Sequence, residues 1–234
     1  RLTNSSGAYG TTISEHLIMV CLMLLRRQME YTEVIRNGGW EMLPGGIRSL
    51  HGARITVLGT GDIGTEFARR AQAFHPACIT GVRRTVRSSD PAFTSIHAIA
   101  ELDSVLPETD ILVMALPSTA ETVGILSRER IALLPDSAFV VNVGRGTAID
   151  QEAFCDALNA GRLAGAALDV VVPEPLPADH PLRRAKNLLL TPHVAGNMTL
   201  GYTCDKSVQM FCDDLENYAA GRPLAHLVDR KRGY

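Results

Sequence analysis

The chain has 234 residues, of which 46% are apolar and 21% are charged, and its formal net charge is −2. These values are typical of a globular protein with a substantial buried core, and without a basic excess we expect no nucleic-acid partner. The five cysteines are scattered and odd in number, which favours free thiols in a reducing, cytoplasmic compartment over a disulfide framework. No histidine or cysteine cluster has the spacing of metal ligands, so we expect no metal site.

The first long segment, residues 12–31, is predicted to form one amphipathic helix ahead of the first strand. Its most apolar part, residues 17–25, is roughly half as long as the ~20 residues that span a bilayer, so we expect a buried helix and no membrane anchor. The chain begins with Arg1 instead of methionine, and no succession of charged, apolar and small residues marks a signal peptide. We therefore expect that a segment upstream of Arg1 is missing.

From residue 54 onward, short apolar runs alternate with amphipathic stretches of helical length. The apolar runs are RITVLG, CITGV, DILVMAL, AFVVNVG, GAALDVVV and NLLLTPH. This alternation predicts parallel strands with helices on both faces, which is a doubly wound α/β sheet of the Rossmann type. Asp150 is expected to cap the helix that follows it, Gly161 to end that helix and Pro135 to end the preceding one. A last long helix is predicted over residues 197–220, before Gly221.

The glycine-rich sequence GTGDIG at residues 59–64 lies between the first predicted strand and the next helix. In this position Gly59 permits the tight turn, Gly61 lets the backbone approach a pyrophosphate, and Gly64 lets the helix pack on the strand. The amino terminus of the helix adds unpaired N–H groups that face the phosphates. In this context the motif predicts a dinucleotide site, and the alternative is a turn that merely requires positive φ angles.

The second predicted strand ends in Arg83 and Arg84, where a dinucleotide fold that prefers NAD usually carries an acidic residue. No acidic residue follows until Asp90. Because guanidinium groups form forked bonds to phosphate oxygens, the two arginines favour the 2′-phosphate of NADP, with NAD as the alternative cofactor. The other interpretation is that both arginines are solvated surface charges.

Three polar residues follow the later apolar runs: Arg145 in VNVGRG, Glu174 in DVVVPEPLP and His193 in LLLTPHVAG. The carboxyl ends of parallel strands form the edge at which open α/β sheets bind ligands. An arginine for a carboxylate, a histidine for a proton and an acid that favours the protonated histidine are the groups needed to reduce a 2-oxo acid. Taken singly, each residue has an ordinary explanation as a solvent-exposed or capping group.

Five segments, the glycine loop among them, resemble the D-isomer-specific 2-hydroxyacid dehydrogenase family. They occur in the family's order and read VLGTGDIG, LPST followed by Glu121 and Thr122, VNVGRGTAID, ALDVVVPEPLP and TPHVAG. The resemblance implies that Arg145 holds the substrate carboxylate and polarises the 2-oxo group. It also implies that His193 is the acid and base of the reaction and that Glu174 is its hydrogen-bond partner.

The resemblance assigns further cofactor contacts. The backbone groups of Asp62 and Ile63 would meet the pyrophosphate, and Asp169 would accept a hydrogen bond from the nicotinamide carboxamide. The cofactor cleft would be lined by Leu116, Pro117 and Val143. The implied partners are NADP or NAD, a small 2-oxo or 2-hydroxy acid and a second copy of the chain in a homodimer.

The resemblance also divides the chain into three parts. Residues 1–11 are expected to be the remnant of a truncated substrate domain, and residues 12–194 the dinucleotide-binding domain with its leading interdomain or dimer helix. Residues 195–234 would be a C-terminal helix and tail that return toward the substrate domain. Because members of the family normally carry a longer segment before the first long helix, we expect this chain to bind cofactor yet turn over poorly.

The residues leave two other functions as alternatives. A dinucleotide-sensing interaction protein would use the same fold without significant turnover, although such a protein needs only the glycine loop. A phosphite or formate dehydrogenase on the same fold would keep the hydride acceptor and change only the hydride donor.

Overall fold

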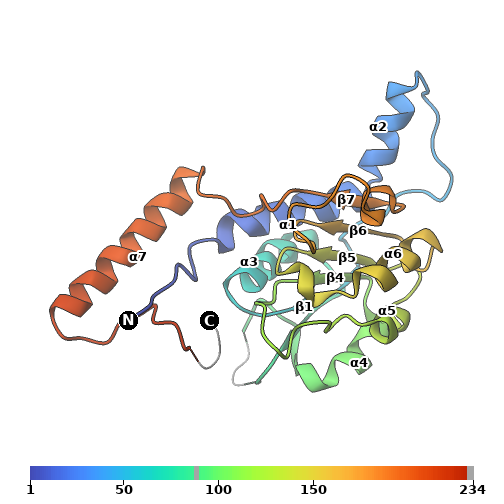
Figure 1. The fold of residues 1–234 in the computed structure, drawn as a ribbon. Helices are drawn as coiled ribbons and strands as arrows, with labels where there is room; N and C mark the ends of the chain where they lie inside the picture. The colour runs from blue at the N-terminus through green and yellow to red at the C-terminus, as the bar shows by residue number, and fades with distance from the viewer. Residues whose placement is uncertain (87–89, 231–234) are drawn as a thin grey trace.

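The computed structural model describes residues 1–86 and 90–230, and these residues form a seven-stranded parallel sheet with helices on both faces (Figure 1). The strands lie in the order β3-β2-β1-β4-β5-β6-β7, which confirms the doubly wound arrangement predicted from the sequence. Their bounds are β1 Arg54–Leu58, β2 Cys78–Arg83, β3 Ser95–Ala98, β4 Ile111–Met114, β5 Phe139–Asn142, β6 Gly165–Leu168 and β7 Leu188–Leu190. The strand order reverses between β1 and β4, and ligands bind at the carboxyl edge of such a switch point.

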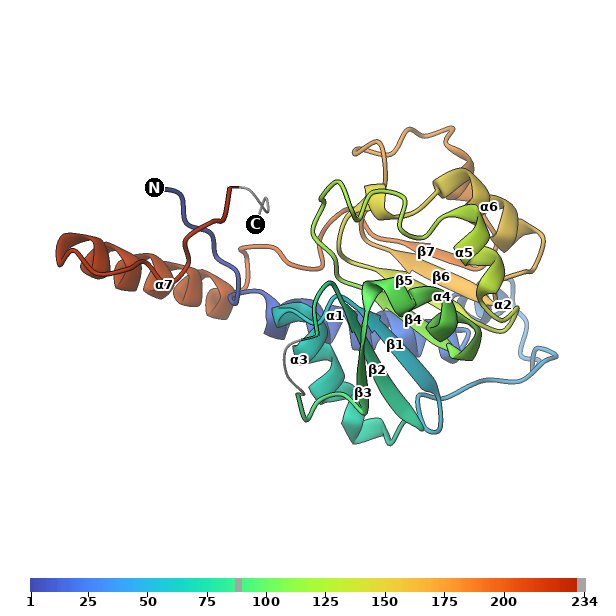
Figure 2. The same cartoon turned by 90° about the horizontal axis from the view of Figure 1, so that it is seen from below.

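Helices cover both faces of the sheet (Figure 2). The α-helices are α1 Gly10–Leu25, α2 Gln28–Arg36, α3 Asp62–Ala71, α4 Leu102–Val105, α5 Arg128–Leu133, α6 Gln151–Asn159 and α7 Gly201–Ala219. Short 3-10 turns lie at Gln72–Phe74, Ile99–Glu101, Leu106–Glu108, Gly146–Ala148 and Pro181–Arg184. Within the described ranges, every helix is too short or too polar to cross a bilayer.

The central strand β4 shows how the two hydrophobic cores are built. Successive side chains of a strand point to opposite faces. Ile111 and Val113 therefore pack into the core that includes α1 and α3, whereas Leu112 and Met114 pack into the core that includes α5 and α6. All four residues are buried, and this is why the strand reads as a continuous apolar run instead of an alternating one.

The predicted single helix over residues 12–31 is wrong in its extent, because the structure has two helices, α1 and α2, in its place. Arg27, which stands between them, has a φ of 55°, and this left-handed conformation cannot continue a right-handed helix. Its guanidinium makes an ion pair with Glu30 in the first turn of α2. Neither proline nor glycine marks the break in the sequence. Helix α2 buries none of its residues and projects from the body of the molecule (Figure 1).

The local helix signals are confirmed. Asp150 Oδ1 accepts a hydrogen bond from Ala153 N at 3.0 Å at the start of α6, and Gly161, with a φ of 71°, follows the end of that helix. Helix α5 ends at Leu133, two residues before Pro135.

Strand β3 was not predicted, because this short strand at the end of the sheet is only partly buried and lacks an apolar run.

The last helix, α7, covers residues 201–219 of the predicted 197–220, and it extends away from the sheet (Figure 1). Only Thr203 and Asp214 of this helix are buried. The first residues of the chain run beside the segment that follows α7 (Figure 2), and Thr3 forms an antiparallel bridge with Leu227. The division at residues 1–11 and 195–234 stays a prediction, and residues 231–234 lie outside the described part of the chain.

Candidate functional site

A cavity of about 750 Å³ opens at the carboxyl edge of the sheet, beside the point where the strand order reverses. Its walls come from the turns after β1, β2, β4 and β5 and from the segment ahead of α1. The predicted site residues that line it are Gly59, Gly61, Asp62, Ile63, Arg83, Arg84, Leu116, Pro117, Val143 and Arg145. A volume of this size is typical of small-molecule and cofactor sites.

The glycine loop fits a dinucleotide. A Cβ atom on Gly64 would lie 2.0 Å from the Gly59 carbonyl oxygen, so α3 packs against β1 only with glycine at this position. A Cβ atom on Gly61 would meet nothing within 4 Å, which leaves open space at the amino terminus of α3 for a pyrophosphate. Thr60 Oγ1 is buried in the same loop and has no hydrogen-bond partner among the described residues. The loop therefore offers open space at the amino terminus of α3.

Arg83 and Arg84 line the cavity beyond the glycine loop. Arg84 Nη1 lies 3.8 Å from Oε2 of Glu121, which belongs to the segment after β4 and also lines the cavity. A carboxylate thus already stands close to one of the two arginines that are predicted to bind a 2′-phosphate. The preference for NADP stays a prediction.

Arg145 leaves β5 through a turn that is fixed by close packing. A Cβ atom added to Gly144 would lie 2.6 Å from backbone atoms of a neighbouring segment. A Cβ atom added to Gly146 would lie 2.3 Å from such atoms. The side chain of Asn142, which is fully buried, accepts a hydrogen bond from Gly144 N at 2.9 Å and donates one to Arg145 O at 3.0 Å. The guanidinium of Arg145 donates to Gly144 O at 2.6 Å, and Arg145 is among the residues that border the cavity.

Glu174 and His193 form a hydrogen-bonded pair, with His193 Nδ1 2.7 Å from Glu174 Oε2. The other carboxylate oxygen, Oε1, accepts a hydrogen bond from Val171 N at 3.0 Å. Partial burial raises the pKa of Glu174, but the bonds from His193 and Val171 outweigh burial and bring the pKa below its usual value. Glu174 is therefore ionised near neutral pH beside the imidazole.

The three predicted catalytic residues reach the same edge because β5, β6 and β7 are neighbouring strands. Strands in a sheet lie ~4.8 Å apart, so the turns that carry Arg145 and His193 are separated by on the order of 10 Å, enough for a small acid. Arg145 borders the cavity, whereas Glu174 and His193 follow the neighbouring strands β6 and β7 at the same edge and are not among its lining residues. That all three meet one substrate stays a prediction.

Asp169, predicted to contact the nicotinamide, is 4% exposed and does not line the cavity. Its carboxylate accepts hydrogen bonds from Thr191 Oγ1, Val194 N and Ala195 N. It therefore faces the turn that carries His193. The contact with a carboxamide stays a prediction.

Two groups of residues at this site were not found from the sequence. Asn142 ends the apolar run FVVN, and a polar residue at the buried end of a strand is a signal that was available. The segment ahead of α1 contributes Ser5, Ser6 and Tyr9 to the cavity wall. Nothing in the local sequence marks this segment, because its place depends on the packing of α1.

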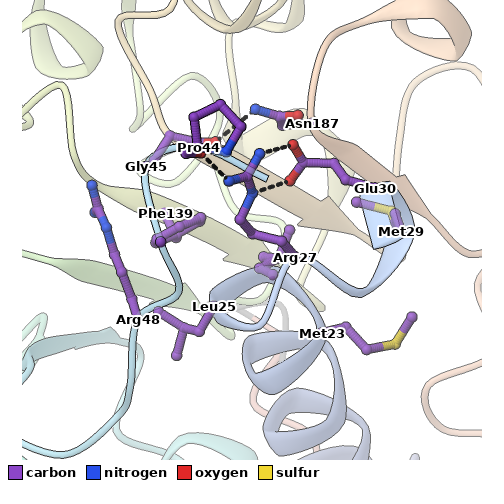
Figure 3. Close-up of a pocket in the computed structure, with 13 residues that line it drawn as sticks. Met23, Leu25, Arg27, Met29, Glu30, Pro44, Gly45, Arg48, Phe139 and Asn187 are labelled. Atoms are coloured by element: carbon purple, nitrogen blue, oxygen red, sulfur yellow. Dashed lines mark hydrogen bonds and ion pairs between the residues drawn. The ribbon is translucent and has the colours of Figure 1, made fainter. Parts of the chain in front are cut away.

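A second cavity, of about 210 Å³, lies at the opposite edge, between the corner of α1 and α2 and the amino ends of β5, β6 and β7 (Figure 3). Arg27 is held there by Glu30 and by the Pro44 carbonyl oxygen. The hydrogen bond from Arg27 lowers the pKa of Glu30. Arg27 is thus already neutralised by this carboxylate, and the larger cavity at the carboxyl edge, which the predicted site residues line, is the better candidate for binding an anionic substrate or cofactor.

In residues 1–86 and 90–230 no group of three or more His, Cys, Asp or Glu side chains could hold a metal ion.

Residues 18–195 match the family model described as the NAD binding domain of D-isomer specific 2-hydroxyacid dehydrogenase. The chain belongs to the D-isomer specific 2-hydroxyacid dehydrogenase family. The resemblance inferred from the five sequence segments is thereby confirmed.

Other members of the dehydrogenase family are similar over most of this chain. Glyoxylate/hydroxypyruvate reductase B of Pectobacterium carotovorum is 35% identical over 190 residues, which are 78% of this chain but only 58% of the relative. A 2-hydroxyacid dehydrogenase of Xanthobacter autotrophicus, solved in complex with NADPH and MES, is 30% identical with a TM-score of 0.87, and the match covers 100% of this chain and 93% of that one. The NADPH-dependent glyoxylate/hydroxypyruvate reductase of Sinorhizobium meliloti, solved with NADP and sulfate, is 28% identical with a TM-score of 0.87, covering 100% and 72%.

Proposed function

We propose that this member of the family is an NAD(P)-dependent oxidoreductase that interconverts a 2-oxo acid and its D-2-hydroxy acid. The observation that carries the proposal is the His193–Glu174 pair, 2.7 Å apart, which follows β6 and β7 at the same sheet edge as the cavity that Arg145 borders. This edge combines a proton donor, its anionic partner and a guanidinium for a carboxylate. The names of the Pectobacterium and Sinorhizobium reductases support a small 2-oxo acid as the substrate.

In the direction of reduction, each of the three residues has one task. Arg145 forms charge-assisted hydrogen bonds to the substrate carboxylate and orients the 2-oxo group. His193 donates the proton to the 2-oxygen from Nε2, the ring nitrogen that does not face Glu174. The ionised Glu174 stabilises the protonated imidazole before this transfer. Bound NAD(P)H supplies the hydride that reduces C2, and in the reverse direction His193 accepts the hydroxyl proton.

The cofactor is proposed to bind with its pyrophosphate at the glycine loop and its adenosine end near Arg83 and Arg84. The two arginines favour NADP, and the NADPH and NADP named for the two solved relatives support this preference. Replacing both arginines with serine is expected to weaken NADPH binding far more than NADH binding in a fluorescence titration. Equal losses would contradict the assignment.

The proposed reaction is tested by comparing His193→Ala with the parent protein in NADPH assays on glyoxylate, hydroxypyruvate and pyruvate. We expect kcat to fall about 10²–10⁴-fold, the usual contribution of a positioned acid, while the Kd for NADPH changes little. Equal turnover of both proteins would remove the enzyme proposal and favour a dinucleotide sensor. Turnover of formate or phosphite with NADP+, in place of the 2-hydroxy acids, would assign a formate or phosphite dehydrogenase reaction instead.

The homodimer stays a prediction that sedimentation velocity would check.

A further inference from the structure

The segment ahead of α1, residues 5–10, is tied to the glycine loop by the side chain of Asp62. Asp62 Oδ2 accepts a hydrogen bond from Gly10 N at 2.7 Å, across 52 positions of the chain. The family resemblance assigned only the backbone of Asp62 to the pyrophosphate, and it gave the carboxylate no task. The residues of the segment that line the cavity, together with residues 59–63 of the loop, are Ser5, Ser6, Gly7 and Tyr9.

Helix α1 depends on Asp62 because its own sequence supplies no cap. The first N–H groups of an α-helix have no acceptor within the helix. Tyr9, at the N-cap position of α1, makes no side-chain hydrogen bond to them, and the first turn contains no acidic residue. A carboxylate at this place is stabilising, because it meets both the N–H groups and the positive end of the helix dipole. Asp62, in the first turn of α3, supplies that carboxylate from another helix.

The fit between the two residues is close. A Cβ atom added to Gly10 would lie 2.4 Å from Asp62 Oδ1, so the carboxylate can take this position only beside a glycine. Gly10 is buried, and α1 and α3 contribute to the same hydrophobic core. The hydrogen bond is itself partly buried, and water therefore competes with it less than with a bond at the surface.

This hydrogen bond links the wall of the cavity to the place where the pyrophosphate is proposed to bind. Asp62 begins α3, next to the open space at Gly61. Its carboxylate holds Gly10, which ends the segment that forms the neighbouring wall. A wall that is already held in the free protein loses little conformational entropy when a ligand binds, whereas a loose wall must be ordered at the expense of affinity.

We propose that Asp62 is a positioning residue for the cofactor, because its carboxylate holds residues 5–10 as a preformed wall of the cavity. This inference rests on the proposed binding of the pyrophosphate at the glycine loop. The carboxylate acts through Gly10 and does not touch the phosphates, which its negative charge would repel. What matters for cofactor affinity is therefore the acceptor oxygen of residue 62 and not its charge.

The test compares Asp62→Ala with Asp62→Asn. Both substitutions remove the charge, but only asparagine keeps an oxygen that can accept the bond from Gly10 N. We expect the Kd for NADPH, from a fluorescence titration, to be at least about threefold higher for Asp62→Ala than for Asp62→Asn, which is within the range of one hydrogen bond. Asp62→Asn should bind NADPH at least as tightly as the parent protein. Equal Kd values for the two variants would overturn the inference.

Gly10→Ala tests the same bond from the side of the donor. Its Cβ atom would displace the Asp62 carboxylate without removing it. We expect the Kd for NADPH to rise as in Asp62→Ala, and the double variant should show no further rise, because each substitution breaks the same contact. Rises that multiply in the double variant would contradict the inference. Should Asp62→Ala fail to fold, Gly10→Ala alone still tests the bond, and an unchanged Kd would refute the positioning role.

Asp150→Ala is the matched control for the loss of a carboxylate at a helix start. Asp150 Oδ1 accepts a hydrogen bond from Ala153 N at 3.0 Å at the start of α6, and Asp150 is not among the residues that line the cavity. This variant should lose stability and keep the Kd for NADPH within about twofold of the parent value. A rise in Kd as large as that of Asp62→Ala would show that affinity merely follows stability, against the inference.

Amide hydrogen exchange in the free protein reports the bond without any cofactor. The amide of Gly10 should exchange faster in Asp62→Ala than in Asp62→Asn, because only the second variant keeps an acceptor for it. Equal exchange rates in the two variants would refute the positioning role. A parent protein that binds NADPH, shows the expected differences among the variants and reduces no 2-oxo acid would refute only the proposed reaction.

Discussion

The carboxyl edge of the sheet has two halves that are built differently. The half proposed to bind the phosphates, here called the phosphate side, comprises residues 59–64 with Arg83 and Arg84 and is shaped by backbone that approaches backbone, as at Gly64. The half proposed to transfer the proton, here called the acid–base side, comprises residues 142–146, 169–174 and 191–195. It has such close approaches at Gly144 and Gly146 and adds buried polar side chains, Asn142 and Asp169, that hold the turns of other residues. The first half should fail when atoms are added, and the second also when hydrogen-bonding groups are removed.

The largest effect is expected on the phosphate side, for Gly64→Ala. Its Cβ atom would lie 2.0 Å from the Gly59 carbonyl oxygen, so α3 must move away from β1. We expect a loss of about 1–3 kcal/mol in the free energy of unfolding, measured by urea denaturation, together with a loss of NADPH binding. Gly61→Ala is the matched control, since its Cβ atom meets nothing within 4 Å, and it should weaken NADPH binding at little cost in stability. Equal losses of stability would show that packing does not distinguish the two glycines.

On the acid–base side, Asn142→Ala removes the amide that holds the turn of Arg145. The substitution leaves Gly144 N and Arg145 O without these partners, which should cost about 1–3 kcal/mol of stability and lower kcat/KM for the 2-oxo acid. The control Thr109→Val breaks the buried hydroxyl pair with Thr56 near the amino edge of the sheet and should lower stability alone. If both variants lost kcat/KM in proportion to stability, Asn142 would have no specific role.

A smaller effect concerns the titration of Glu174. Its pKa lies below the usual 4.5, so the stability from its bonds to His193 and Val171 is complete above about pH 4.5 and is lost as the pH falls through the lower, folded value. Because the Glu174 side chain is 36% exposed, solvent keeps this contribution small. His193→Gln should raise the pKa of Glu174, as measured from its side-chain carbon signal in NMR. An unchanged titration would mean that the imidazole does not stabilise the carboxylate.

The smallest effect is expected for Glu121→Gln, which removes the carboxylate 3.8 Å from Arg84. Because both side chains are more than a third exposed, their attraction is worth less than about 1 kcal/mol. We expect the affinity for NADPH to rise by less than about fivefold while the affinity for NADH stays constant. The control Glu33→Gln breaks an exposed pair with Arg36 on α2 and should change neither affinity. A gain for both cofactors would indicate that Glu121 does not act on the 2′-phosphate.

Features that depend on local periodicity or on one short segment were predictable from the sequence. The buried strands read as apolar runs, Asp150 and Gly161 marked the ends of α6, and the five family segments led to the correct family. The glycine loop belongs to this group, because the close approach that requires Gly64 is to Gly59 of the same loop. The doubly wound parallel sheet followed from the alternation of apolar runs and helical stretches.

Other features were decided only by tertiary structure, because they join residues that are distant in the chain. Arg27 breaks the first helix, and its guanidinium is held by the carbonyl oxygen of Pro44, seventeen positions further along. The hydrogen bonds that Asp169 accepts from the histidine turn span 22 to 26 positions and exist only because β6 and β7 are neighbours. A residue's type indicates that it can accept a hydrogen bond, but only the folded chain determines which donor stands within 3 Å of it.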